Sequence, residues 1–270
     1  MTGFTEGSRH DDRQAARLLE LAAKHATGAL HLKGGRGGIV YLRDGEVAHV
    51  ESALTPGVAA LLLRPGYTEE RWAEVLPSLR QGGESDDAAT AAVELLRSGQ
   101  VSPVHLEVLR RGATADAALA VLTALATSES MRSRPRFRPG ERHWCPVGRT
   151  IPVADVLTEV RRRTALLGRL APGVGPDQPV DRAVRLWFDP VRLTAGQWDV
   201  VRLAGGSRTP RDIAWLLGHG VFATTVAVHQ LARLGVVSIR GGPTGAAPHR
   251  VPLSFLRATN AVVGGRSLRT

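Results

Sequence analysis

The chain has little of what an exported, membrane-bound or disulfide-stabilised protein needs. Its only cysteine among 270 residues is Cys145, so no internal disulfide can form, as is usual in the reducing cytoplasm. No apolar run approaches the roughly 20 residues of a membrane-spanning helix. The polar start MTGFTEGSRHDDRQ lacks the apolar core of a secretory signal. With 43% hydrophobic and 22% charged residues, the sequence predicts a folded cytoplasmic protein with room for two domains.

The motifs of common enzyme and metal sites are also missing. The glycine run Gly34–Gly38 lacks the Lys and Ser or Thr of a phosphate-binding loop and lies between predicted antiparallel strands, which favours a turn. The spacing of His25, His31 and His49 matches no common zinc site, and we interpret them as surface or edge histidines. No G-x-S-x-G, H-E-x-x-H or paired-carboxylate motif occurs. The sequence therefore predicts no catalytic residues, no cofactor, no metal and no enzyme activity.

Acidic residues are scarce in the second half of the chain. Residues 1–130 hold 13 Lys and Arg against 17 Asp and Glu, whereas residues 131–270 hold 22 against 8. The two halves therefore carry net charges of −4 and +14, within a total of +10. This asymmetry indicates that only the second half meets a polyanion.

The most informative pattern lies in Val191–Arg240. Amphipathic segments are separated by Gly205-Gly206 and by Gly218, and the apolar strand VVSIR follows them. Thr209 is a favourable N-cap, and Pro210 suits the first helical position after it. Further on, VVSIR and RVPLSF flank the loop GGPTGAAP, which is typical of a strand, a wing and a second strand. The pattern predicts a winged helix-turn-helix.

Two families share features of this segment. HQLARLGVV resembles the end of the recognition helix in the winged helices of bacterial transcription regulators, and this resemblance implies binding to double-stranded DNA. LTAGQWDVVRLAGGSRTPRDIAWLLG is similar to the PqqD-type peptide-recognition modules, although Gly205-Gly206 stands where they have Asp-Gly. The second resemblance implies capture of a peptide or protein partner, and both alternatives stay open.

In the DNA-binding interpretation, the third helix enters the major groove and basic side chains around it hold phosphates. This helix is expected to expose Thr225, His229 and Arg233 on the face opposite its buried stripe. The predicted DNA contacts are Arg208, Arg211, Thr224, Thr225, His229, Arg233, Arg240 and Arg250. The helix offers no Arg, Lys, Asn or Gln before Gln230, so it is a weak reader of base edges, which keeps the peptide alternative open.

The first half predicts a helix followed by a three-stranded meander, with the hairpin dipeptide Asp44-Gly45. TGALHLKGGRGGIVYLRDGEVAHVES is similar to the PATAN-like regulatory domain, and RFRPG and IPVADVLTEVRRR look like its closing strand and terminal helix. The resemblance implies a bacterial signalling module that works through protein contacts. For the three arginines Arg161–Arg163 there are three alternatives: contacts to phosphate, pairing with acidic residues of the first half, or solvation of the helix end, with the last as the default because charges in a helix's last turns complement its dipole. A helical insertion departs from the family pattern, with helices expected at Pro103–Arg111 and Thr114–Thr127 among others.

Together these patterns predict an α+β chain with two domains. Residues 1–170 form a PATAN-like regulatory or assembly domain with a helical insertion at about 55–128, residues 171–180 a linker, and residues 181–270 a winged helix-turn-helix domain. The predicted function is a DNA-binding transcriptional regulator; the alternative is a non-enzymatic signalling adaptor. A homodimer held by the first half is expected, because one short recognition helix reads too little without a second half-site. A signalling protein is a further possible partner of the first half.

Overall fold

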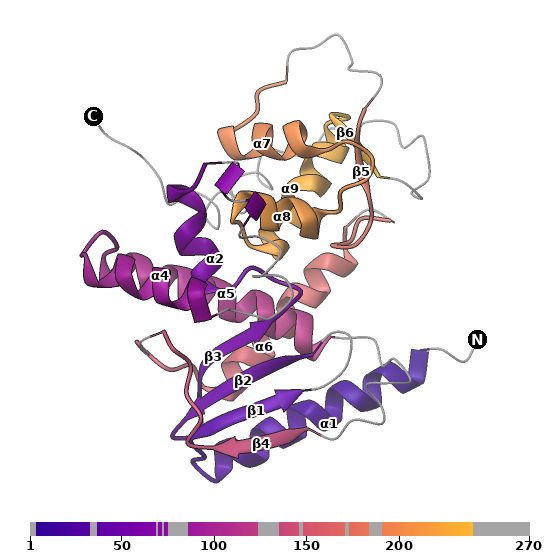
Figure 1. Cartoon of the computed structure of the whole chain (residues 1–270). Helices are drawn as coiled ribbons and strands as arrows, with labels where there is room; N and C mark the ends of the chain where they lie inside the picture. Colours follow the sequence, from indigo (N-terminus) through magenta and orange to yellow (C-terminus); the bar gives the residue numbers. More distant parts are fainter. Residues whose placement is uncertain are drawn as a thin grey trace.

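A small antiparallel sheet and a larger set of helices make up the structure (Figure 1). The computed structural model describes residues 4–32, 37–68, 70–71, 73–74, 86–123, 135–145, 148–170, 173–183 and 191–239. This part contains eight α-helices with defined ends, a four-stranded sheet and a two-stranded sheet, which confirms the predicted α+β class. No helix of the part described is both long and apolar enough to cross a membrane.

The four-stranded sheet has the order β3-β2-β1-β4, and every neighbouring pair is antiparallel. Its strands are β1 (Gly28–Leu32), β2 (Gly38–Arg43), β3 (Glu46–Ser52) and β4 (Arg136–Pro139). Asp44 and Gly45 form the turn between β2 and β3 with φ of 52° and 81°, the left-handed region that such hairpin turns require. The predicted meander and the predicted strand in RFRPG are confirmed.

One face of this sheet carries the main hydrophobic core. The alternation of side chains along a strand puts Leu30, Val40 and Val50 on this face, and all three are buried. The face is covered by α1 (Phe4–Ala23), α5 (Pro103–Leu122) and α6 (Val153–Gly168). Their core residues are Leu18, Leu21, Ala117, Ala118, Val121, Leu122, Val153, Val156 and Val160.

The helix α5 is continuous where the sequence predicts two helices. Ser102 caps its start by accepting a hydrogen bond from the amide of His105, and Pro103 takes the first helical position as expected. Gly112 lies inside the helix, where a glycine costs only about 1 kcal/mol relative to alanine. Arg110 before it and Ala113 and Ala117 after it are buried, so packing on both sides of the glycine outweighs this cost.

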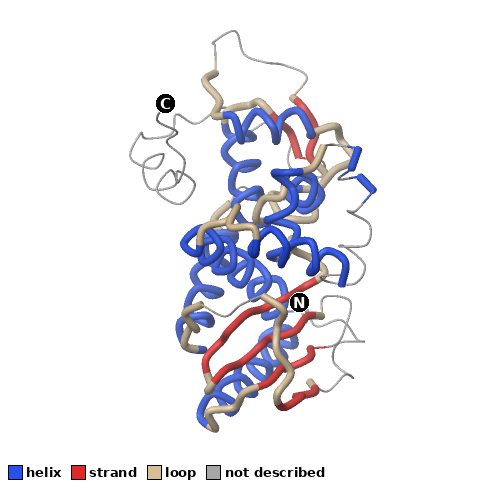
Figure 2. Tube along the Cα trace, turned by 60° about the vertical axis from the view of Figure 1, so that its left-hand side comes forward, coloured by secondary structure: helices blue, strands red, loops and turns tan. Residues whose placement is uncertain are grey.

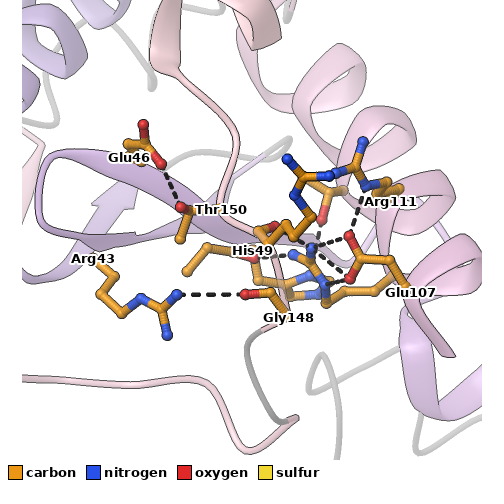
Figure 3. A network of polar contacts seen from close by, with 11 residues as sticks. Arg43, Glu46, His49, Glu107, Arg111, Gly148 and Thr150 are labelled. Atoms are coloured by element: carbon orange, nitrogen blue, oxygen red, sulfur yellow. Dashed lines mark hydrogen bonds and ion pairs between the residues drawn. The ribbon is translucent and has the colours of Figure 1, made fainter. Parts of the chain in front are cut away.

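The β4–α6 segment, described at residues 140–145 and 148–152, follows the sheet. Its end pairs with β3: the amide of Val47 donates to the carbonyl of Ile151 over 2.8 Å. Two side chains reinforce this pairing, as Figure 3 shows. The guanidinium of Arg43 donates to the carbonyl of Gly148, and the hydroxyl of Thr150 donates to Glu46. The segment is therefore fixed to the sheet by both backbone and side chains.

A second core lies between the sheet and the C-terminal helices. All six residues of α2 (Val58–Leu63) are buried in it, beside α4 (Asp86–Arg97) and the start of α5. The short 3-10 helix η1 (Arg64–Gly66) follows α2. Trp215 joins this core from the C-terminal helices and is 2% exposed. Chain segments about 150 residues apart therefore share one apolar cluster.

The C-terminal region is described at residues 173–183 and 191–239. It contains β5 (Val180–Arg182), α7 (Ala195–Leu203), α8 (Pro210–Leu217), α9 (Val221–Arg233) and β6 (Val237–Ile239). Thr194 and Thr209 form capping boxes at the starts of α7 and α8, and the second of these caps is the one predicted. β5, at the end of the predicted linker, pairs with β6. The second strand of the predicted wing lies outside the described residues.

The sheet and the C-terminal helices lie at opposite ends of the molecule. In Figures 1 and 2 the four strands occupy one end, the helices α7–α9 occupy the other, and α2, α4 and α5 lie between them. The third hydrophobic core is formed within the C-terminal region, around Val200, Ile213, Val228 and Leu231. The predicted DNA contacts that the structure describes lie on α8 and α9 or directly before α8.

Candidate nucleic-acid interface

The start of α8 carries two arginines that were predicted to hold phosphates. Arg208 is exposed, and its guanidinium donates to the carbonyl of Leu203 over 3.2 Å. The side chain of Arg211 is only 12% exposed, and it forms an ion pair with Asp177 at 2.7 Å. Arg211 also donates to the carbonyl of Leu54 over 2.6 Å. The donors of Arg211 are directed at the protein in this structure, and its contact with phosphate stays a prediction.

The start of α9 is covered by the first part of the chain. The amide of Phe222 donates to the carboxylate of Asp116 on α5 over 3.3 Å. Arg163 on α6 forms an ion pair with Asp116, and its guanidinium carbon lies 4.6 Å from the centre of the Phe222 ring. A Cβ atom on Gly220 would lie 2.7 Å from the same carboxylate. The positive end of α9 is thus occupied by a side-chain anion where a phosphate would bind.

Burial dominates the electrostatics of this carboxylate. Burial raises the pKa of Asp116 above its ordinary value of 3.8, while Arg163 and the first amides of α9 act in the opposite direction. The raised pKa means that its two partners do not fully offset the loss of water around the carboxylate. Asp116 therefore depends on keeping both contacts.

The expected exposed face of α9 is buried. Thr224, Thr225 and His229 are 3%, 1% and 7% exposed. The expectation that the helix exposes Thr225 and His229 is therefore wrong, and their contact with DNA stays a prediction. Both threonine hydroxyls donate within the helix, to the carbonyls of Gly220 and Val221 over 2.9 and 2.8 Å. The physical reason is periodicity. Residues 222, 225 and 229 lie on one face of α9, and Phe222 is held under Arg163.

The remaining predicted contacts do not complete a basic rim. Arg233 is half-buried in the last turn of α9. Burial lowers the pKa of His229, and the positive charge of the nearby Arg233 lowers it further. Arg240 and Arg250 lie outside the described residues. Among the predicted contacts that the structure describes, only Arg208 is exposed. The described residues therefore do not surround α9 with arginines directed at solvent.

A further contact fixes the turn between α8 and α9. The guanidinium of Arg64 in η1 donates to the carbonyl of Leu216 over 2.7 Å. Gly218 ends α8 in the left-handed region with φ of 62°, and a Cβ atom there would lie 2.6 Å from the Cβ of Arg64. We call the contacts that α8, α9 and the turn between them make with the first part of the chain the α9 junction. Its residues are Leu54, Arg64, Asp116, Arg163, Arg211, Leu216, Gly218, Gly220 and Phe222.

The sequence signal for the α9 junction is weak. Asp116 is the one charged residue in ATADAALAVL, and an isolated charge in an apolar helix is a recognisable sign of a buried partner. Arg163 is one of three consecutive arginines predicted to solvate a helix end. Its side chain is only 13% exposed and pairs with Asp116, whereas Arg162 is 50% exposed, so for Arg163 the default is wrong and the alternative of pairing with an acidic residue of the first half is confirmed.

The chain matches no family model, no curated protein and no solved structure.

Proposed function

We propose that this protein is a non-enzymatic adaptor that acts by binding protein partners. The observation that carries the proposal is the covered start of α9, whose first amides face Asp116 instead of solvent. A helix that reads a major groove needs that end free. The interpretation of the first part as PATAN-like, and of α7–α9 with β6 as a winged helix, belongs to the same proposal. The element order supports both parts of it.

A second candidate is a DNA-binding regulator whose recognition helix becomes accessible when the α9 junction opens. The excess of 22 basic over 8 acidic residues in positions 131–270 favours it. In that case the closed junction is the inactive state. The two candidates differ in the expected effect of opening the junction: DNA binding tightens for the regulator and is unchanged for the adaptor.

Fluorescence anisotropy with a labelled duplex of about 30 base pairs, at about 50 to 200 mM salt, separates the candidates. Asp116→Lys places a positive charge against Arg163 and the start of α9, and thereby opens the junction. Asp155→Lys is the matched control, because Asp155 is exposed on α6 and the change in net charge is identical. The adaptor proposal predicts the same weak binding and salt slope for wild type and both variants.

Tighter binding by the Asp116 variant, by about 10-fold or more over the Asp155 variant, together with a steeper salt slope, would overturn the adaptor proposal in favour of the regulator. Far-UV circular dichroism establishes that both variants are folded before they are compared.

We also propose that the protein forms a cytoplasmic homodimer through its first part. Val104 and Val108 support this, because they lie one turn apart on α5 and are 75% and 63% exposed. Sedimentation velocity on the full chain tests it, with Val108→Glu expected to shift the dimer towards monomer. A wild type that sediments as a monomer at all accessible concentrations contradicts the dimer and leaves the adaptor proposal unaffected.

A further inference from the structure

The outer face of the four-stranded sheet, opposite the main core, carries a cluster of polar side chains that the proposed function does not use. His49 and Glu51 are two positions apart on β3, so their side chains lie on the same face of the sheet. Tyr41 on β2 is paired with His49 and shares this face. The β4–α6 segment brings His143 against it, with the rings of His143 and His49 4.1 Å apart.

Hydrogen bonds hold Glu51 and His143 in place. The carboxylate of Glu51 accepts from the Tyr41 hydroxyl over 3.0 Å, and its other oxygen lies 2.7 Å from Nε2 of His143. The backbone amide of Cys145 donates to Nδ1 of His143 over 3.1 Å. The neutral ring of His143 therefore carries its proton on Nε2 and donates it to Glu51.

His49 is the exception in this ordered cluster. It is 1% exposed, and its Nδ1 lies 2.9 Å from the hydroxyl of Thr114 on α5. Its other nitrogen, Nε2, is buried and has no hydrogen-bond partner within the part of the chain that the structure describes. Buried polar atoms are rarely left without a partner, because the loss of water is then uncompensated. Such a nitrogen marks a place where a ligand atom is missing.

We propose that His49, Glu51 and His143 bind a divalent transition-metal ion, with Zn²⁺ as the best match. One donor atom from each of the three residues lies within 4.8 Å of the others. Ligand atoms at about 2.1 Å from a tetrahedral zinc ion lie roughly 3.4 Å apart. The widest pair in the cluster therefore has to close by up to about 1.4 Å, whereas Nε2 of His143 and the Glu51 oxygen, now 2.7 Å apart, have to separate slightly as the ion takes the place of the proton between them.

The donor types select the metal. Two imidazole nitrogens and one carboxylate suit Zn²⁺, Co²⁺ or Ni²⁺, whereas Ca²⁺ and Mg²⁺ prefer oxygen ligands alone. Three protein ligands leave a fourth position for water or a small anion. Tyr41 and Thr114 would then orient the ligands from behind, as outer partners do in metal sites generally.

Two features of the surroundings act on such an ion. Arg110 lies nearby and donates to the carbonyl of Ala48, but its charge is balanced by Glu107 at 2.9 Å. The ion also replaces the proton on Nε2 of His143, as metals do at histidine ligands. The proton then moves to Nδ1, and the amide of Cys145 must turn away. The β4–α6 segment is therefore expected to shift when the metal binds.

Titration of the metal-free full-length protein with Co²⁺, followed by visible absorption, tests the proposal. A d–d band that saturates at one equivalent and disappears when Zn²⁺ is added is expected. His49→Asn keeps a polar group near Thr114 but removes Nε2, and Glu51→Gln keeps the shape and removes the charge. Each variant should bind Co²⁺ at least about 100-fold more weakly, because each loses a ligand.

The matched control is His31→Asn, since His31 lies on the neighbouring β1 and bonds Glu141 at 2.9 Å outside the cluster. It should leave the band unchanged. If His49→Asn does not fold by circular dichroism, Glu51→Gln decides the question. Absence of the band in wild type overturns the proposal, as does a band that survives in the folded variants. An intense near-ultraviolet charge-transfer band would assign the ion to Cys145 instead and likewise overturn it.

Discussion

Arg110 is a fully buried cation, and every part of its guanidinium has a partner. It donates to the carbonyls of Ala48 and Arg149, the second over 2.6 Å, and it pairs with Glu107. These contacts join α5 to β3 and to the β4–α6 segment. Figure 3 shows Glu107 on the right of this network, with the neighbouring Arg111 also bound to it. One side chain thus connects three elements.

Arg110→Lys is expected to lower the free energy of unfolding by about 2 kcal/mol, because lysine cannot reproduce several charged hydrogen bonds directed at fixed positions. Urea denaturation followed by tryptophan fluorescence measures the loss. Arg111→Lys is the matched control, since Arg111 is 49% exposed and bonds only Glu107 among the contacts described. Its effect should stay within about 0.5 kcal/mol. Equal effects of the two changes would contradict the role given to Arg110.

Asp116 should make stability depend on pH in a defined direction. Its pKa is raised in the folded protein by burial, so the folded state binds the proton more tightly than the unfolded state. The resulting stabilisation is fully present below the ordinary value of 3.8 and is lost as pH rises through the raised folded-state value. The difference in unfolding free energy between wild type and Asp116→Asn should therefore fall over this window and then level off. A difference that rises with pH would contradict this prediction.

At the scale of elements, the turn between α8 and α9 depends on Gly218. Alanine there has both an unfavourable left-handed backbone and a clash with Arg64, so Gly218→Ala should cost about 2 to 4 kcal/mol. Gly99→Ala provides the comparison. Gly99 has φ of 72° but open space around a Cβ atom, and about 1 kcal/mol is expected. Thermal or urea unfolding of both variants measures the difference, and equal costs would remove the contact with Arg64 as a cause.

The elements themselves could largely be predicted from local signals. Alternating apolar residues and Asp44-Gly45 indicate the meander, and Thr209-Pro210 marks the start of α8. The α9 junction could not be predicted in this way, because Asp116 and Phe222 are 106 positions apart and no short pattern links them. Threonine and histidine also suit either face of a helix, so the burial of Thr225 depends on what covers α9. For the metal cluster, His49-x-Glu51 on one strand face was a signal, but His143 comes from a distant segment.

At the scale of the whole molecule, the described parts of the two halves should unfold together. Trp215 contributes to the core around α2, and the α9 junction adds polar contacts between the same regions. Tryptophan fluorescence and far-UV circular dichroism should therefore report one coincident urea transition for the full chain. Asp116→Lys weakens the connection and should separate the two probes. Two transitions in the wild type would show that the halves are energetically independent.

The shared core also sets an order of events during synthesis. The six apolar residues of α2 leave the ribosome long before Trp215, which follows about 150 residues later and takes roughly 8 to 30 s to arrive at bacterial or eukaryotic elongation rates. During that interval a nascent chain carries an apolar surface that only its own later residues cover. Chains that stop before α8 can cover α2 with α4 and α5, but the part of this surface that Trp215 covers stays exposed. Premature termination in this gene would thus yield an aggregating fragment that chaperones and proteases must remove.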